Sequence, residues 1–352
     1  MSEMVKPTAA AALLLTAMPL LAQPDSAVEK EKSYVPKLEG VVKVKLEESL
    51  YGGRARFDVR NSRLGVRGNI SESMSYRSQI ELSNEGRLSV LDAYVACRLK
   101  AVSISLGQQH YAFSADLARS PMQNIFANRT FVAKFATTYA DTSGNVRSLG
   151  SRDIGGMLTV NLQRWIPVVL KAGLFNGSGV NNPVWQEHLN FSAKAEYGGE
   201  HGLQAAASYY SGQTPYAQRI DMWGAELRYI APKFTVDGEV AQRTYEQGGR
   251  NTLTAAYLQG LYRFNLKPGA LVRYLAPTVR YDVARNGRYE SAFGQFDAQR
   301  VSVGMNVGAL HKPFKGEVRL NFEKYITSRK PGNYSVDELL HDKVTLEMVV
   351  AF

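Results

Sequence analysis

Apolar and polar residues alternate along most of the chain, from residue 39 to its last residue. In the first such stretch, Val42, Val44 and Leu46 alternate with charged side chains. A period of two residues is typical of a β-strand that has one apolar face. The alternation predicts strands over 42–47, 54–70, 74–82, 91–99, 102–107, 154–163, 168–174, 189–198, 202–211, 222–230, 233–243, 252–264, 273–285, 299–309, 315–326 and 342–352.

The second predicted strand changes its alternation in the middle. Val59 is apolar on one parity, whereas Leu64 is apolar on the other. An extra residue in one strand of a pair restores the apolar face on the far side of the irregularity. We therefore expect a β-bulge near Asn61 and Ser62.

The connections between the predicted strands alternate in length. Short links are expected at 71–73, 100–101, 165–167, 199–201, 231–232 and 310–314, and longer ones at 110–152, 176–188, 212–221, 244–251, 286–298 and 327–341. Bacterial outer-membrane barrels have an even number of strands, short turns on one side and long loops on the other. The sequence therefore predicts an all-β protein, a transmembrane antiparallel β-barrel of about 16 strands over residues 39–352.

The connection at 110–152 is the longest and the richest in positive charge. Connections usually have ~4–6 residues, so one of about 40 residues is either functional or unstructured. We expect it to be the third external loop, to fold into the lumen and to bias the pore toward anions. A surface loop with no part in the pore is the alternative. Its basic residues are Arg119, Arg129, Lys134, Arg147 and Arg152, set against Asp116 and Asp141.

The first residues differ in composition from the rest. Lys6 precedes an apolar run that ends near Ala22, which is typical of a secretory signal peptide over residues 1–22. A membrane anchor is the alternative, but about 15 apolar residues fall short of the ~20 that a spanning helix needs. Residues 23–38 are charged and have no period, so we expect a short periplasmic lead. No later apolar run reaches the ~18 residues of a transmembrane helix.

A soluble β-sandwich also shows alternation and frequent turns. Against it, the polar faces of the predicted strands carry many charges, and no helix that would cover a sheet is predicted. Aromatic residues also fall near predicted strand ends, where the girdles of membrane barrels lie. They are Tyr209, Tyr210, Trp223, Tyr229, Tyr257, Tyr262, Phe264, Tyr281 and Phe352.

The last strand, VTLEMVVAF, places its apolar residues on one face and ends in phenylalanine. This pattern resembles the assembly signal by which the barrel-assembly machinery recognises outer-membrane barrels. An ordinary final strand would not require a terminal aromatic residue. The residues of the expected signal are Val344, Leu346, Met348, Val350 and Phe352.

Several short motifs follow one another along the chain. They are RFDVRNSRLGVRG at 56–68, Asp92-Ala93-Tyr94, Gly107-Gln108, Phe113-Ser114, Ser120, Asn128-Arg129, Arg152-Asp153-Ile154-Gly155, FNGSG at 175–179 and Val279-Arg280-Tyr281-Asp282. Taken in this order, they resemble the phosphate-selective porin O and P family of trimeric porins. The resemblance implies a passive, anion-preferring channel that forms a homotrimer in the bacterial outer membrane. The regular arginine ladder and lysine cluster of phosphate-selecting members do not align here, so the solute stays open.

The balance of 42 basic against 32 acidic residues gives a net charge of +10. Such an excess suits either an anion-preferring lumen or contact with the negative outer leaflet of the membrane. The parity of the strands points basic residues inward, where arginine can hold a carboxylate or phosphate with two bonds. They are Arg77, Arg98, Lys171, Lys194, Arg228, Arg263 and Arg280, with Glu81, Asp92, Glu196, Glu226 and Asp282 placed to pair with some of them.

Other classes of function have weaker support. The five histidines lie in or beside predicted turns and have no serine or acid at a catalytic spacing. Asp237 and Glu239 share a strand face, but charge balance explains such a pair in a lumen. We expect no enzyme activity, cofactor, metal site or nucleic-acid partner. The remaining alternative to a channel for small anions or organic solutes is a surface barrel, an adhesin or receptor with a plugged lumen.

Overall fold

The protein is described by a computed structural model over residues 34–51, 53–84, 87–136, 152–213, 219–246, 250–267, 271–286, 296–309, 314–329 and 341–352. The expected signal peptide and most of the expected lead lie outside these residues. The first strand begins at Lys37.

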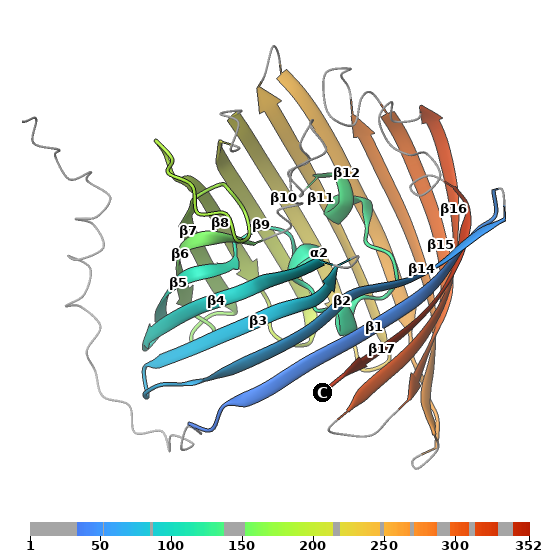
Figure 1. Ribbon diagram of the computed structural model, residues 1–352, viewed down its shortest axis with the longest axis horizontal. Helices are drawn as coiled ribbons and strands as arrows, with labels where there is room; N and C mark the ends of the chain where they lie inside the picture. Colours follow the sequence, from blue (N-terminus) through green and yellow to red (C-terminus); the bar gives the residue numbers. More distant parts are fainter. Residues whose placement is uncertain are drawn as a thin grey trace, which may run out of the picture. The chain divides into compact units, whose positions relative to one another are not determined.

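These residues form one antiparallel sheet (Figure 1). Its strands are β1 (Lys37–Ser49), β2 (Arg54–Asn69), β3 (Met74–Asn84), β4 (Arg87–Leu99), β5 (Val102–His110), β6 (Arg152–Asn161), β7 (Val168–Phe175), β8 (Asn190–Tyr197), β9 (Gly202–Gln213), β10 (Arg219–Ile230), β11 (Phe234–Glu246), β12 (Arg250–Tyr262), β13 (Phe264–Asn265), β14 (Val272–Asn286), β15 (Phe296–Ala309), β16 (Lys315–Arg329) and β17 (Lys343–Ala351).

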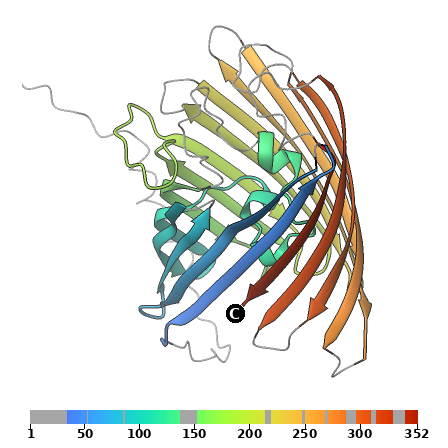
Figure 2. The ribbon, with the colours of Figure 1, turned by 45° about the vertical axis from the view of Figure 1, so that its right-hand side comes forward.

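The sheet closes on itself, because β1 pairs with β2 on one edge and with β17 on the other. The two-residue β13 continues β12 beyond Arg263, and both pair with β14. The described residues therefore form the predicted closed barrel of 16 strands. Figure 2 shows the strands inclined around the interior, with β1 and β17 side by side. Closure removes the unpaired edges that would otherwise be exposed to lipid.

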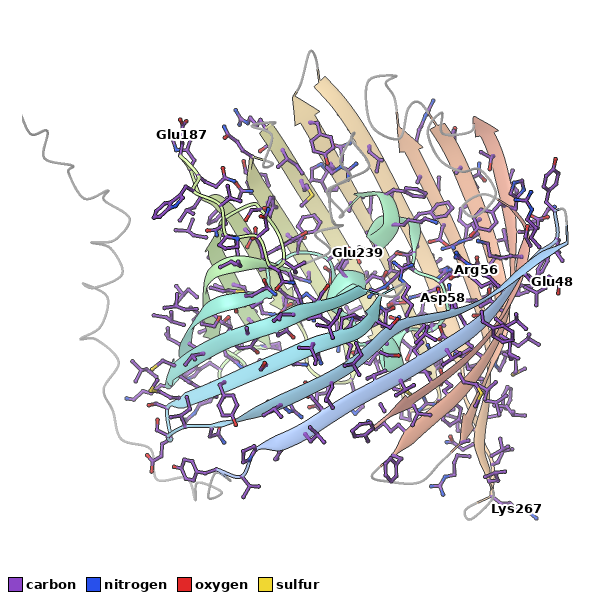
Figure 3. The ribbon with its side chains drawn as sticks, in the orientation of Figure 1. Glu48, Arg56, Asp58, Glu187, Glu239 and Lys267 are labelled. Carbon is purple, nitrogen blue, oxygen red and sulfur yellow. The ribbon has the colours of Figure 1, made fainter. Side chains whose placement is uncertain are left out.

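Polar side chains face the interior and apolar ones face outward. In β1, Val42 and Val44 are 49% and 39% exposed, whereas Lys43 and Lys45 are only 3% and 5% exposed. In a soluble protein the apolar face of a sheet packs on the core, whereas here it faces outward. An apolar outer face is expected where lipid surrounds the barrel. In Figure 3, Asp58 and Glu239 lie within the ring of strands, and Glu187 and Lys267 lie at its two ends.

The predicted bulge in β2 is confirmed. The pairing of β2 with β3 shifts register at Arg60, Ser62 and Arg63. Asn61 has φ of 59°, a conformation that asparagine adopts more readily than most residues. The apolar face is thus restored beyond the shift, as the sequence required.

Two expected loops are shorter than predicted. Instead of ending near 211 and resuming near 222, the chain continues in β9 to Gln213 and re-enters the sheet at Arg219. Likewise β11 reaches Glu246 and β12 begins at Arg250, where a loop over 244–251 was predicted. Main-chain pairing does not need an apolar outer face, so the strands extend past the end of the alternation.

The prediction of an aromatic girdle is wrong for two tyrosines. Tyr210 and Tyr257 are 0% and 6% exposed and face the interior. Their parity is that of the inward residues Ser208 and Gln259. The other aromatic residues named for the girdle are exposed: Tyr209, Trp223, Tyr229, Tyr262, Phe264, Tyr281 and Phe352.

The described part of the connection after β5, residues 111–136, contains three short helical turns. They are α2 (Ala115–Ala118), η1 (Pro121–Gln123) and the π-helical η2 (Val132–Ala136). Across the ranges given above, no helix is long and apolar enough to cross a membrane.

Candidate pore-lining site

Residues 111–136, here called the inner segment, lie against the inward face of the barrel wall (Figure 1). Main-chain amides of the segment donate to inward side chains of strands that are far apart around the barrel. Ala112 donates to Ser192 of β8 over 3.3 Å, and Ala127 donates to Asn321 of β16 over 2.9 Å. Phe131 donates to Asp282 of β14, also over 2.9 Å. The segment is therefore held along the wall by many strands at once.

The start of α2 is held by wall carboxylates. Ser114 caps this turn, because its hydroxyl accepts from the amide of Leu117 over 3.3 Å. The amide of Ala115 donates to Glu226 over 2.9 Å, and Glu226 also accepts from Lys194 over 2.7 Å. Free amides at a helix start favour a nearby negative charge. The Phe113-Ser114 stretch therefore has a structural role.

Arg119 joins the inner segment to β11 through a buried ion pair with Asp237. Its guanidinium also lies 3.3 Å from Asp116. Arg228 of β10 approaches the same Asp237 over 3.2 Å. Two carboxylates thus neutralise Arg119, whose side chain is 4% exposed. Its main effect is to fix the segment rather than to attract solute.

Wall arginines hold the other half of the inner segment by its carbonyl groups. Arg280 donates to the carbonyl of Asn128 over 2.9 Å, and Arg300 donates to that of Arg129 over 2.7 Å. Arg319 donates to Met122 over 3.1 Å. All three guanidinium groups are nearly inaccessible to solvent and have carboxylate partners on the wall.

Sequence reasoning missed Arg300 and Arg319 as site residues. Both lie on the inward parity, since Val301 and Leu320 next to them face outward. Parity applied to every basic residue would have found them. It would also have found Lys43, which donates to the carbonyl of Ala127 over 3.1 Å.

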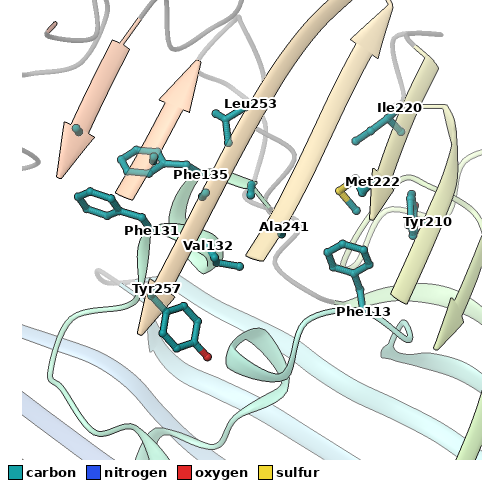
Figure 4. Packing of buried hydrophobic residues seen from close by; sticks show 14 of the residues in the cluster. Phe113, Phe131, Val132, Phe135, Tyr210, Ile220, Met222, Ala241, Leu253 and Tyr257 are labelled. Atoms are coloured by element: carbon teal, nitrogen blue, oxygen red, sulfur yellow. The ribbon is translucent and has the colours of Figure 1, made fainter. Parts of the chain in front are cut away.

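An apolar cluster forms between the inner segment and the wall (Figure 4). Phe113, Phe131 and Phe135 of the segment are each at most 3% exposed. They face wall residues that include Met222 and Leu253. Burying a large apolar side chain contributes ~1.5–3 kcal/mol. The cluster therefore stabilises the segment against the wall in addition to its hydrogen bonds.

A second group of positive charges lies on the wall of β2, β3 and β6. Arg152 donates to Asp92 over 2.6 Å and 3.3 Å. Arg77 approaches the same carboxylate over 3.3 Å. Arg63 pairs with Glu81 over 3.0 Å. The pairing of inward cations with inward acids that the sequence predicted is thus confirmed here.

Arg129 brings a charge of the inner segment close to that wall. Burial lowers the pKa of Arg129 from its ordinary value, and the positive charges of Arg60 and Arg152 act in the same direction. Asp116 opposes this effect. Arg129 donates to the main-chain carbonyl of Asp116 over 2.7 Å. Positive charge therefore accumulates where the segment meets β2 and β6.

The remaining predicted residues are distributed more widely. Lys171 pairs with Glu196 over 2.7 Å on the wall of β7 and β8. Arg98 is exposed at the end of β4 beside the turn at 100–101. Lys134 is half-buried in η2, with its ammonium group 5.7 Å from the centre of the Phe135 ring. Arg147 lies outside the described residues.

Asp153, from another family stretch, organises the connection after β7. Its carboxylate accepts main-chain bonds from Gly177 over 2.6 Å and from Gly179 over 3.1 Å. These glycines have φ of 74° and 82°, which side chains disfavour. The FNGSG stretch therefore wraps a buried carboxylate.

A closed 16-stranded barrel with an apolar outer face and a charged interior is the architecture of outer-membrane porins. Residues 41–193 match the family model described as phosphate-selective porin O and P. The match confirms the resemblance found in the sequence and supports a place in the bacterial outer membrane. Family and fold point to a channel rather than to an enzyme.

Solved structures share the fold at low identity. Salmonella typhi OmpF, in complex with daunomycin, has a TM-score of 0.64 at 13% identity, over 90% of this chain and 97% of that one. The loop L8 deletion mutant of Vibrio cholerae OmpT has a TM-score of 0.59 at 10% identity, over 90% and 98%. The Acinetobacter baumannii outer-membrane channel DcaP has a TM-score of 0.58 at 14% identity, over 90% and 97%. None of the curated proteins matches the chain.

Proposed function

We propose that the protein is a passive diffusion channel that prefers small anions, either phosphate or other small anionic organic solutes. The observation that supports this proposal is the group of arginines on β2, β3 and β6, together with Arg129 of the inner segment. Charges at a narrow point of a pore select ions by sign. The group contains Arg60, Arg63, Arg77, Arg129 and Arg152, and the acids paired with it on the wall are Glu39, Glu81 and Asp92.

The preference follows from an excess of charge rather than from free cations. Each acid in the group lies beside at least one guanidinium, and Asp116 lies near Arg129, so the group has five positive charges against four negative ones. Charges in a confined passage with low-dielectric walls are screened less than charges in open solvent. A small excess of positive charge therefore has a measurable effect on ion selectivity. A mild preference for anions is therefore expected.

We also propose that the channel is a homotrimer. One structure of Vibrio cholerae OmpT with the same fold is a trimer form. Outward apolar residues of neighbouring strands would supply the contact between copies. Cross-linking of the protein in detergent, followed by mass determination, tests this assembly.

The experiment for the function is a planar bilayer with purified protein in a KCl gradient. The reversal potential should have the sign of chloride permeation and should shrink as salt rises. A reversal potential of potassium sign would overturn the anion preference. A barrel that inserts but shows no conductance would instead favour the adhesin or receptor with a plugged lumen.

A further inference from the structure

A cavity of about 690 Å³ lies between the inner segment and the ends of β10 to β16 nearest their short turns. It is here called the turn-end cavity. Its volume is within the ~300–1,000 Å³ range of small-molecule sites. The lining residues that matter below are Arg119, Met122 and Ile125 of the inner segment, and Arg228, Asp237, Leu261, Arg263, Leu266, Arg273, Tyr274, Phe314, Lys315 and Glu317 of the wall and its turns.

The lining has an excess of positive charge. Five of these residues are basic and two are acidic, which leaves a net charge of +3. Both acids already have protein partners. Asp237 is bound by Arg119 and Arg228.

Glu317, the second acid, accepts from Arg319 over 2.5 Å and from the hydroxyl of Tyr274. A solute in the cavity therefore meets a positive field. An anion is the solute that this field favours.

One arginine of the lining is held in a defined plane. The guanidinium carbon of Arg263 lies 4.4 Å from the centre of the Tyr274 ring. Stacking on an aromatic ring orients the flat guanidinium group and leaves its edge for hydrogen bonds. A guanidinium edge matches the two oxygens of a carboxylate. Arg263 is thus suited to hold a planar carboxylate.

Part of the lining is apolar. Met122 and Ile125 of the inner segment contribute to it, together with Leu261, Leu266 and Phe314 of the wall and its turns. Inorganic phosphate is small and strongly hydrated, so it would gain little from these side chains. A solute with an apolar body would remove that surface from water, which contributes ~25 cal/mol per Å².

We infer that the turn-end cavity is a binding site for carboxylates on an aromatic body of about the size of benzoate. The carboxylate pairs with Arg263 and the neighbouring cations, and the ring covers the apolar side formed by Leu261 and Phe314. This inference rests on the proposed function only in that the solute must reach the cavity through the pore. The inferred site also identifies aromatic carboxylates as the class of organic anion that the channel carries.

The test uses single channels of the full protein in KCl, with benzoate, acetate or phosphate added on one side. Benzoate should reduce the chloride current in a saturable manner, at concentrations where acetate and phosphate do not. The variant Arg263→Gln should raise the concentration for half-reduction about tenfold, as expected when one charge-assisted contact is lost. Phe314→Ser should weaken benzoate while leaving the response to acetate unchanged.

The matched control is Arg164→Gln, which removes an exposed arginine from the turn between β6 and β7. It should leave the benzoate response as in the unaltered protein. The proposed site would be wrong if benzoate and acetate reduced the current equally, or if benzoate reduced the current equally in all three variants.

The reversal potential in a KCl gradient, measured on the same channels, separates the two proposals. If the channel prefers anions but benzoate has no effect, the proposed benzoate site is wrong and the proposed channel function stands. If benzoate reduces the current, Arg263→Gln relieves this effect and the channel shows no anion preference, the proposed benzoate site stands and the proposed anion preference is wrong.

Discussion

The ring of Phe352, the last residue, lies directly against Gly40 of β1. Their main chains exchange two hydrogen bonds of 3.0 Å, from each amide to the carbonyl of the other. A methyl group on Gly40 would come within 2.2 Å of the ring. The closure of the barrel thus ends on an aromatic ring that covers a glycine.

Gly40→Ala should weaken this closure, because the ring must move to admit a side chain. We expect a lower temperature for the heat-induced mobility shift on gels. Gly199→Ala is the control, since no heavy atom lies within 4 Å of an added side chain there. Identical transitions of the two variants would show that the ring contact contributes nothing to stability.

Deletion of Phe352 should reduce the amount of barrel in the outer membrane more than Gly40→Ala does. The deletion removes both the closing contact and the proposed assembly signal, whereas Gly40→Ala retains the terminal residue. Quantitative blotting of membrane fractions measures the difference. Truncation of the lead within residues 24–33 is the control and should have little effect. Normal levels after the deletion would argue against a signal in the final strand.

The positive charges of the connection at 110–152 should bias the pore toward anions. Replacing Arg119, Arg129, Lys134, Arg147 and Arg152 together by serine should lower the anion preference and its dependence on salt. Among single changes, Arg129→Ser should have a larger effect than Arg119→Ser on the reversal potential, because two carboxylates neutralise Arg119. The reverse order would contradict the assignment. Arg164→Ser, in an exposed turn, is the control.

Asp237→Asn should loosen the inner segment. The change leaves Arg119 and Arg228 without their shared partner, and breaking a buried ion pair costs ~3–5 kcal/mol. We expect a lower unfolding temperature and noisier single-channel currents. Asp221→Asn is the matched control, because its partner Arg219 is 62% exposed and surface pairs contribute little. A current as quiet as that of the control would show that Asp237 does not hold the segment.

Lys134 should make the anion preference depend on pH. Burial lowers its pKa well below the ordinary 10.5, and Lys343 and Arg300 add to the effect while Glu323 opposes it. Its positive charge is therefore present at low pH and is lost as pH rises through a range below that of an ordinary lysine. The anion preference should fall over that range.

Reversal potentials across a pH series measure this dependence, and Lys134→Met should remove it. Lys233→Met, in the exposed turn between β10 and β11, should retain it. A pH profile that survives Lys134→Met would assign the titration to another group.

The strand order and the closed barrel could be predicted from the sequence, because lipid outside and water inside impose one alternation on every strand. The same rule located the bulge near Asn61 and the outward face of β17. It identified inward cations such as Arg280, since parity alone decides which side of the wall a residue faces. It failed for Tyr257 because an aromatic residue was assumed to face the membrane.

Only the tertiary structure decided which charges pair and what they hold. Arg119 meets Asp237 from a distant part of the chain, because the inner segment lies along the inward face of the wall and reaches β11. Arg300 holds a main-chain carbonyl rather than facing the solute, which no period in the sequence reveals. Alternation depends only on residues that are neighbours in the sequence, so it can be recognised from the sequence alone. Ion pairs across a lumen depend on the closure of the whole barrel, and so they follow from the fold.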